Sequence, residues 1–197
     1  MYPEDVDRQS RCRLPLPRRE ELSGAAAQIY DSLADPKGGS IRGLRGPGGI
    51  HLHSPQLALH TRALNHYLRR EADLSGRLRE LAILTTAREL DSQIEWTAHE
   101  PEALREGLSS QIVDVIRCRR DTARLDPADA IVIELGREIF ANREVSSATF
   151  ARRTGAIRSA QACRSGRAVG NYAATAALLT AFDVQLDPDQ PPLLPMP

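Results

Sequence analysis

Carboxylate and imidazole side chains gather between residues 80 and 99, in a pattern that favours acid/base chemistry. Glu95 and His99 are four residues apart, so on a helix they share one face about one turn apart. Glu80 lies among apolar residues, where a buried carboxylate needs a partner that His99 or Glu95 can supply. A carboxylate beside an imidazole fixes the tautomer of the ring and favours its protonated form, which makes the ring a usable proton donor.

The same residues also allow purely structural interpretations. Ser92 and Glu95 match a helix capping box, in which the carboxyl group only satisfies a backbone N–H. Glu95 and His99 also match an ordinary exposed helix pair, which contributes about 0.2–0.5 kcal/mol. Trp96 is the single tryptophan, and such a residue is typical of an anchor in a core or an interface.

A glycine-rich segment over residues 37–50 reads KGGSIRGLRGPGGI, and its six glycines and one proline predict a loop. It lacks the lysine and Ser/Thr ending of a Walker A motif. Arg42 and Arg45 suit either a flexible lid over an anionic substrate or a plain solvated loop. His53 follows the loop directly before the helix cap Ser54, and we expect its side chain to point into a cleft.

Metal and thiol chemistry are not expected from this sequence, and no cofactor is implied. Histidines cluster between residues 51 and 66, but no neighbouring carboxylate or cysteine completes a metal site there. The three cysteines are far apart and form no CxxC pair. Sparse, unpaired cysteines are typical of a reducing compartment, so we expect a cytoplasmic protein.

Composition excludes several classes of protein. The 197 residues contain 26 Lys and Arg and 26 Asp and Glu, so the net charge is zero and no general nucleic-acid binder is expected. Three arginines near residues 117–120 are more typical of a solvated helix end. No apolar stretch approaches the roughly 18 residues of a membrane span, and the first residues show no secretory signal.

Helical periodicity recurs along the chain, and no segment alternates apolar and polar residues as a strand does. The sequence therefore predicts an all-α domain over residues 20–186, with an extended arm over 1–19 and a proline-rich tail over 187–197. Sequence signals mark the helix ends. Serines and Asp126-Pro127 are typical of helix starts, and Gly107 is typical of the residue that follows the C-terminal end of a helix. The expected helices cover residues 20–35, 54–73, 75–90, 92–105, 109–117, 126–142, 146–153 and 156–182, the last with a break near Gly166 or Gly170.

Taken together, these segments resemble the carboxymuconolactone decarboxylase family, which shares its fold with alkylhydroperoxidase-like proteins. The core of the resemblance is RLRELAILTTARELDSQIEWTAHEPEALREGLSSQIVDVIR, residues 77–117. RGPGGIHLHSPQLA precedes it and LDPADAIVIELGREIFANREVSSATF follows it. The resemblance covers roughly residues 20–186 and implies an alkylhydroperoxidase-like helical bundle that assembles into trimers or hexamers, with sites near subunit contacts.

Thiol peroxidases among these relatives carry a Glu followed by a Cys-x-x-Cys-x-x-x-His segment. The matching residues are Glu80, Ser92, Glu95 and His99, so both cysteine positions are substituted. Serine and glutamate form neither a sulfenic acid nor a mixed disulfide, which disfavours a thiol hydroperoxidase. The chain is more similar to the decarboxylase-like branch, here without the cysteine pair.

The resemblance implies a cofactor-independent lyase or isomerase that acts on a small anionic lactone or a related conjugated acid, by decarboxylation or proton-transfer isomerisation. His99 would be the proton donor or base, Glu95 would orient it, and Glu80 would be a second carboxylate. The residues expected to contact the substrate are Arg45, His53, Trp96 and Ser92. The alternative is a non-catalytic, oligomeric helical protein that binds a small ligand or a partner.

Overall fold

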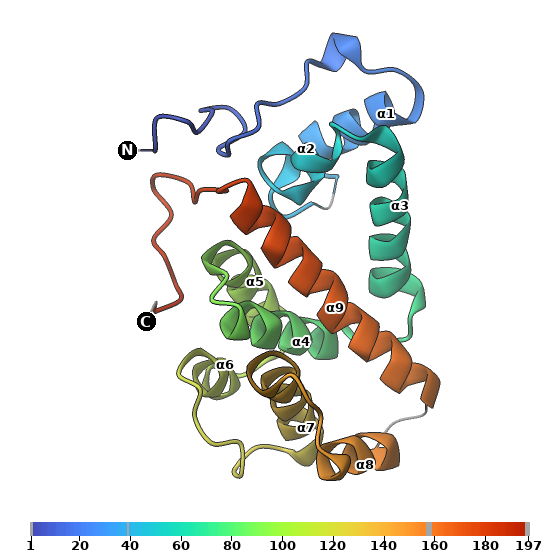
Figure 1. Cartoon of the computed structure of the whole chain (residues 1–197), viewed down its shortest axis with the longest axis vertical. Helices are drawn as coiled ribbons and strands as arrows, with labels where there is room; N and C mark the ends of the chain where they lie inside the picture. The colour runs from blue at the N-terminus through green and yellow to red at the C-terminus, as the bar shows by residue number, and fades with distance from the viewer. Residues whose placement is uncertain (1, 39, 157–158, 196–197) are drawn as a thin grey trace. The chain divides into compact units, whose positions relative to one another are not determined.

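The fold is all-α in the part of the chain that the structure describes (Figure 1). The structure is a computed structural model that covers residues 2–38, 40–156 and 159–195, with only the backbone described for 153–156 and 159–162. Every regular element within these ranges is a helix, as the sequence predicts. Among the described residues no helix is long and apolar enough to cross a membrane.

The chain divides into two compact units. Unit 1 contains Met1–Tyr67 and Ala177–Pro191, and unit 2 contains Leu68–Ala176 and Pro192–Pro197. These divisions do not coincide with the predicted boundaries at residues 19 and 186. Periodicity identifies single helices, whereas the grouping of helices depends on contacts between residues distant in sequence.

Unit 1 is built from short helices around a small core. Its helices are α1 (Gly24–Ala34), α2 (Pro47–His51) and α3 (Pro55–His66), with short 3-10 helices at Arg19–Glu21 and Gly43–Arg45. All three α-helices contact one another. Ile29, Leu52 and Ala58 form the buried centre of this unit.

The glycine-rich segment is partly helical, contrary to the predicted loop. Pro47 occupies the first turn of α2, where its fixed φ is favourable and its missing N–H costs no hydrogen bond. Gly49 is required by close packing, because a Cβ at this position would lie 2.0 Å from the carbonyl oxygen of Leu44. Its glycines therefore serve close backbone contact as well as conformational freedom.

The N-terminal arm is folded by local turns and by pairing with the segment after the last helix. The Asp7 carboxylate accepts the backbone N–H groups of Gln9 and Ser10. Arg13 N donates to Phe182 O at 2.8 Å, and a second backbone bond at 2.8 Å joins residues 185 and 11. The arm is therefore a paired part of unit 1, and local turns fold the segment that the sequence predicts as an extended arm over residues 1–19.

Unit 2 contains the longer helices, with α4 at its centre. They are α4 (Gly76–Glu89), α5 (Gln93–Arg105), α6 (Ser110–Arg117), α7 (Pro127–Arg137), α8 (Ser147–Ala156) and most of α9 (Ser159–Ala181). α4 contacts α5, α6 and α7, and forms a helical hairpin with α5 (Figure 1). Every residue of α4 from Glu80 to Arg88 is buried, so this helix has covered side chains on all its faces.

Helix ends in unit 2 follow the signals found in the sequence. The side chains of Ser75, Ser109 and Asp126 each accept a backbone N–H from the first turn of the helix that follows. Gly107 comes directly after the end of α5 with a φ of +92°, which glycine adopts without steric cost. These local patterns predicted the boundaries because capping involves residues only a few positions apart.

Two predicted helices end in π-helical turns. The helix predicted over 54–73 becomes α3 followed by a π-helix at Tyr67–Glu71, and the one predicted over 126–142 becomes α7 followed by a π-helix at Glu138–Asn142. Side-chain periodicity does not distinguish one wide turn from an α-helical turn.

The last predicted helix is α9, and it is continuous over Ser159–Ala181. Residues 157 and 158 lie outside the described residues. The predicted break at Gly166 or Gly170 is wrong, since both glycines are helical. A glycine inside a helix costs only about 1 kcal/mol relative to alanine, which neighbouring contacts can offset.

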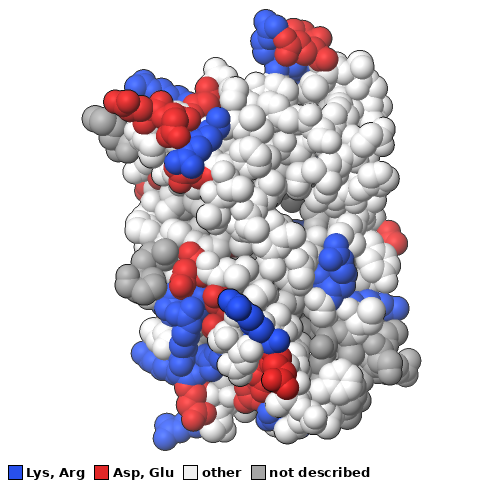
Figure 2. All heavy atoms as spheres, in the orientation of Figure 1, with Lys and Arg blue, Asp and Glu red and all other residues white. Residues whose placement is uncertain are grey.

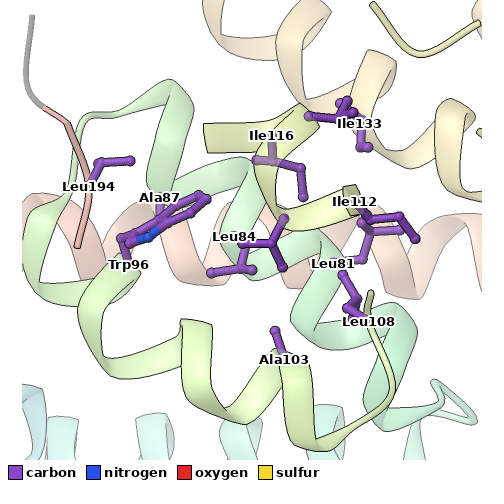
Figure 3. Close-up of a cluster of buried hydrophobic side chains, with 12 residues drawn as sticks. Leu81, Leu84, Ala87, Trp96, Ala103, Leu108, Ile112, Ile116, Ile133 and Leu194 are labelled. Atoms are coloured by element: carbon purple, nitrogen blue, oxygen red, sulfur yellow. The ribbon is translucent and has the colours of Figure 1, made fainter. Parts of the chain in front are cut away.

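The main core of unit 2 includes Trp96 and reaches the C-terminal tail. Trp96 is fully buried and clusters with Leu84, Ile116 and Ile133, and Leu194 of the tail joins the same cluster (Figure 3). Leu193 N donates to Thr97 Oγ1 at 3.3 Å, which fixes the tail along α5. As predicted, the tail does not continue a helix. It completes the hydrophobic core of unit 2.

Leu194→Ala tests this docking. We expect the free energy of unfolding to fall by about 2–5 kcal/mol, the usual range when a buried leucine is truncated to alanine. Because Trp96 is the single tryptophan, its fluorescence should shift to longer wavelength as water reaches the indole. Urea unfolding and emission spectra measure both effects. Leu104→Ala is the control, since Leu104 is 45% exposed, and an unchanged spectrum and stability in Leu194→Ala would rule the docking out.

Candidate functional site

Glu80 and His99 form a buried hydrogen-bonded pair between the two helices of the α4–α5 hairpin. The Glu80 Oε2 atom lies 2.7 Å from His99 Nδ1, and the two side chains are 2% and 5% exposed. Glu80 is in the first half of α4 and His99 is midway along α5, so the turn over residues 90–92 brings them to the same level. The pairing that the sequence allowed is therefore present.

The pair defines which ring nitrogen carries the proton. Burial raises the pKa of Glu80, but the hydrogen bond from His99 and the charges of His99, Arg79 and Arg69 outweigh burial, so the net pKa lies below its ordinary value. An ionised carboxylate is only an acceptor, so Nδ1 of His99 donates to it. In the neutral ring Nε2 is then the acceptor, which leaves it available as a base.

Glu95 lies on the other side of the imidazole. Its Oε2 is 3.9 Å from His99 Nε2, which is beyond hydrogen-bond distance, and the two groups attract each other as an ion pair only when the ring is protonated. The sequence suggested that Glu95 orients His99 and that Glu80 is the second carboxylate. The distances reverse this assignment. Glu80 makes the hydrogen bond to Nδ1 of His99, whereas Glu95 faces Nε2, the other ring nitrogen.

Two of the structural alternatives for this segment, the capping box and the exposed helix pair, fail. Ser92 is the N-cap residue of α5, but its side chain makes no capping hydrogen bond, so no capping box forms. Ser92, Glu95 and His99 are all buried, which excludes an ordinary exposed helix pair. Residues at positions i, i+3 and i+7 share one helix face, so Ser92 lies on the same side of α5 as the two ionisable groups.

A guanidinium group holds the second oxygen of Glu80. Arg79 Nε lies 3.4 Å from Glu80 Oε1, while Nη1 donates to the carbonyl oxygen of Arg69 at 3.5 Å. Arg79 Nη2 also lies 3.7 Å from Glu106 Oε1. Glu80 is therefore fixed from two directions, by His99 at one oxygen and by Arg79 at the other.

Tyr172 of α9 completes the surroundings of the imidazole and was not selected from the sequence. The centroids of the Tyr172 and His99 rings are 5.7 Å apart and their planes make an angle of 81°. Burial raises the pKa of Tyr172, with the charges of Glu80 and Glu95 acting in the same direction and those of Arg69 and Arg79 against it. The available signal was weak: Tyr172 is the single aromatic residue between positions 151 and 181.

Trp96 lies within the hydrophobic core. Its Nε1 donates to Glu100 Oε2 at 2.6 Å, and the guanidinium carbon of Arg117 lies 5.7 Å from the ring centroid. The side chain is fully buried, as expected for a core anchor. A contact between Trp96 and a substrate stays a prediction without a geometric counterpart.

Arg45 and His53, the residues expected to bind an anionic group, belong to unit 1. Both side chains are exposed, and His53 Nε2 lies 2.8 Å from the carbonyl oxygen of Pro15. Their contact with a substrate therefore stays a prediction. In unit 2, Arg69 and Arg79 are the cations whose charges act on Glu80 and Tyr172.

Arginines at the end of α6 are paired with acids and backbone carbonyls. Arg117 pairs with Glu100 and with Asp114, and Arg119 donates to the carbonyl of Arg88 at 2.9 Å. Blue and red side chains are accordingly mixed on the face of the molecule drawn in Figure 2. This pairing is typical of a solvated helix end. Over the described residues no group of three histidine, cysteine or acidic side chains could hold a metal ion.

Comparisons of the chain with family models, with curated proteins and with solved structures gave no match in any of the three. The resemblance to the carboxymuconolactone decarboxylase family thus rests on the residues quoted above.

Glu80→Gln removes the charge of the buried carboxylate and keeps its size. Near neutral pH we expect the free energy of unfolding to fall by about 1.5–3 kcal/mol, the range for a hydrogen bond to a charged group. The pKa of Glu80 is lowered from 4.5, so its carboxylate stabilises the fold above pH 4.5, and this contribution is lost as the pH falls through the folded-state value. The difference from wild type should therefore shrink in acid.

Urea unfolding near neutral pH and at several values below pH 4.5 measures this difference. Glu144→Gln is the matched control, because Glu144 is exposed and should give no change at any pH. A destabilisation by Glu80→Gln that grows in acid would contradict the assigned charge.

Proposed function

We propose that this chain is a cofactor-free acid/base enzyme, a carboxy-lyase or a related lyase or isomerase, that acts on a small anionic lactone or conjugated acid. The observation that supports this is the buried Glu80–His99 hydrogen bond with Glu95 facing the second ring nitrogen. An oriented imidazole in a water-poor site is the usual means of moving a proton near neutral pH. The same residues carry the resemblance to the carboxymuconolactone decarboxylase family.

In the proposed reaction, the bond between the lactone carbon and its carboxylate breaks and carbon dioxide leaves. The electron pair passes into the conjugated carbonyl system as an enolate, and a proton then returns to carbon. His99 enters this step protonated on both ring nitrogens, gives the Nε2 proton to carbon while Glu80 holds Nδ1, and afterwards takes a proton back from water at Nε2. In an isomerisation, Nε2 of the neutral ring would take a proton from one carbon and return it to another, without loss of carbon dioxide.

Electrostatics around the pair favour departure of a carboxylate. Glu95 and Glu80 place negative charge on both sides of His99, and an anionic carboxylate close to Glu95 would be repelled until it becomes neutral carbon dioxide. Arg79 and Arg69 supply the positive charge that offsets the enolate.

We also propose a cytoplasmic homo-oligomer, a trimer or hexamer, on the basis of the same resemblance. Leu57 and Leu59 on α3 are 50% and 36% exposed, and a second copy of the chain would cover such apolar surface.

His99→Gln tests the proposed chemistry. We expect kcat to fall about 10²–10⁴-fold, the usual contribution of a general acid or base, while the circular dichroism spectrum stays that of the wild type. The probes are carboxymuconolactone and a small panel of conjugated γ-lactone acids, in deuterated water, with nuclear magnetic resonance following loss of the carboxyl group and uptake of deuterium.

His60→Gln is the matched control, since His60 is exposed, and it should keep full activity. Full activity in His99→Gln would refute the role of the imidazole. Saturable binding of these acids by the wild-type protein, with no turnover and no deuterium uptake, would favour the non-catalytic ligand-binding alternative.

A variant lacking all three cysteines distinguishes acid/base from thiol chemistry. Cys118 and Cys163 are exposed and Cys12 is buried, and no two of them are paired. We expect the variant Cys12→Ala, Cys118→Ser, Cys163→Ser to keep lactone turnover within about twofold, because no proposed step uses sulfur. Loss of turnover together with loss of hydroperoxide consumption, in a folded variant, would contradict the proposed chemistry.

A further inference from the structure

Tyr172 is the aromatic contact of the His99 ring, and it comes from a third helix. The Glu80–His99 pair belongs to the α4–α5 hairpin, whereas Tyr172 lies on α9. Its side chain is buried, being 7% exposed, and it meets the imidazole at a centroid distance of 5.7 Å with the planes at 81°. This is the edge contact that aromatic rings prefer over direct stacking.

A single hydrogen bond does not fix an imidazole ring completely. The ring is attached through Cβ, so the bond from Nδ1 to Glu80 limits its rotation about the Cβ–Cγ bond, but a hydrogen bond tolerates a range of angles and leaves the ring some freedom to tilt. A tilt of this kind would change the direction of Nε2 relative to Glu95, now 3.9 Å distant, without breaking the bond. A second contact, with a ring whose plane lies at 81° to that of the imidazole, restricts this freedom.

We propose that Tyr172 is a positioning residue whose ring fixes the plane of the His99 imidazole and so the direction in which Nε2 exchanges its proton. The expected effect on turnover rests on the proposed function. The expected effect on the orientation of His99 does not, because it depends only on the folded protein.

The aromatic ring, rather than the phenol, carries this role. Burial and the nearby carboxylates Glu80 and Glu95 raise the pKa of Tyr172, so the phenol stays neutral across the working range of an imidazole. Phenylalanine keeps the ring and its edge, whereas leucine and methionine keep apolar bulk but lose both. The three substitutions therefore separate ring, hydroxyl and volume.

The first readout is the nitrogen spectrum of protein labelled with ¹⁵N-histidine, which reports the tautomer and mobility of His99. We expect one Nδ1–H tautomer in the wild type and in Tyr172→Phe. In Tyr172→Leu and Tyr172→Met we expect exchange-broadened or shifted His99 signals. Tyr67→Leu is the matched control, because Tyr67 is 38% exposed and should leave His99 unchanged.

The second readout is turnover of the lactone acids. We expect kcat to fall about 10–100-fold in Tyr172→Leu and Tyr172→Met, with KM within about twofold, because a displaced proton donor slows the chemical step more than binding. Tyr172→Phe should restore kcat to within about twofold of the wild type.

The proposal is overturned if the His99 signals of folded Tyr172→Leu or Tyr172→Met match the wild type, or if Tyr172→Phe behaves like them. If neither leucine nor methionine is tolerated, the wild-type spectrum decides: a nuclear Overhauser contact between the two rings supports the role, and its absence overturns it. Wild-type protein without turnover, but with His99 signals that respond to Tyr172, would refute the proposed function and leave the positioning role standing.

Discussion

Burying a carboxylate is the constraint on which the rest of unit 2 depends. An isolated charge in the interior is too costly to keep, and a buried ion pair stabilises a fold only when both partners are well placed. Glu80 meets this requirement with His99 on one oxygen and Arg79 on the other. The α4–α5 hairpin must therefore keep its register, since a shift by one residue would separate Glu80 from His99 and leave Arg79 as its partner.

Helix α4 can hold such a group because it is covered on every side. An amphipathic helix would have turned Glu80 towards water, but here polar and apolar residues from Glu80 to Arg88 are buried alike. Thr85 and Thr86 satisfy their hydroxyls by donating to carbonyls one turn earlier in the same helix. Only Glu80 and Arg88 need partners from elsewhere, and Arg88 finds one in the carbonyl of Pro195.

The parts that the sequence predicted are those governed by local rules. Ser75 and Asp126 begin helices through bonds to residues two or three positions away, and the need of Glu80 for a partner pointed to His99. Tyr172 and Leu194 were beyond such reasoning, because nothing near them in the sequence reveals the side chains that they meet. The exchange of roles between the two carboxylates likewise depends on a difference of about an ångström, which helical spacing does not resolve.

The guanidinium of Arg79 shows why one basic residue cannot replace another at this position. Its three nitrogens point in different directions within one plane and reach Glu80, the carbonyl of Arg69 and Glu106. That carbonyl belongs to the π-helical turn Tyr67–Glu71, so an irregular turn of backbone is joined to the site through a side chain. A lysine ammonium carries its three donors on one nitrogen at the end of a flexible stem, so it could not reach three groups spread around a guanidinium plane.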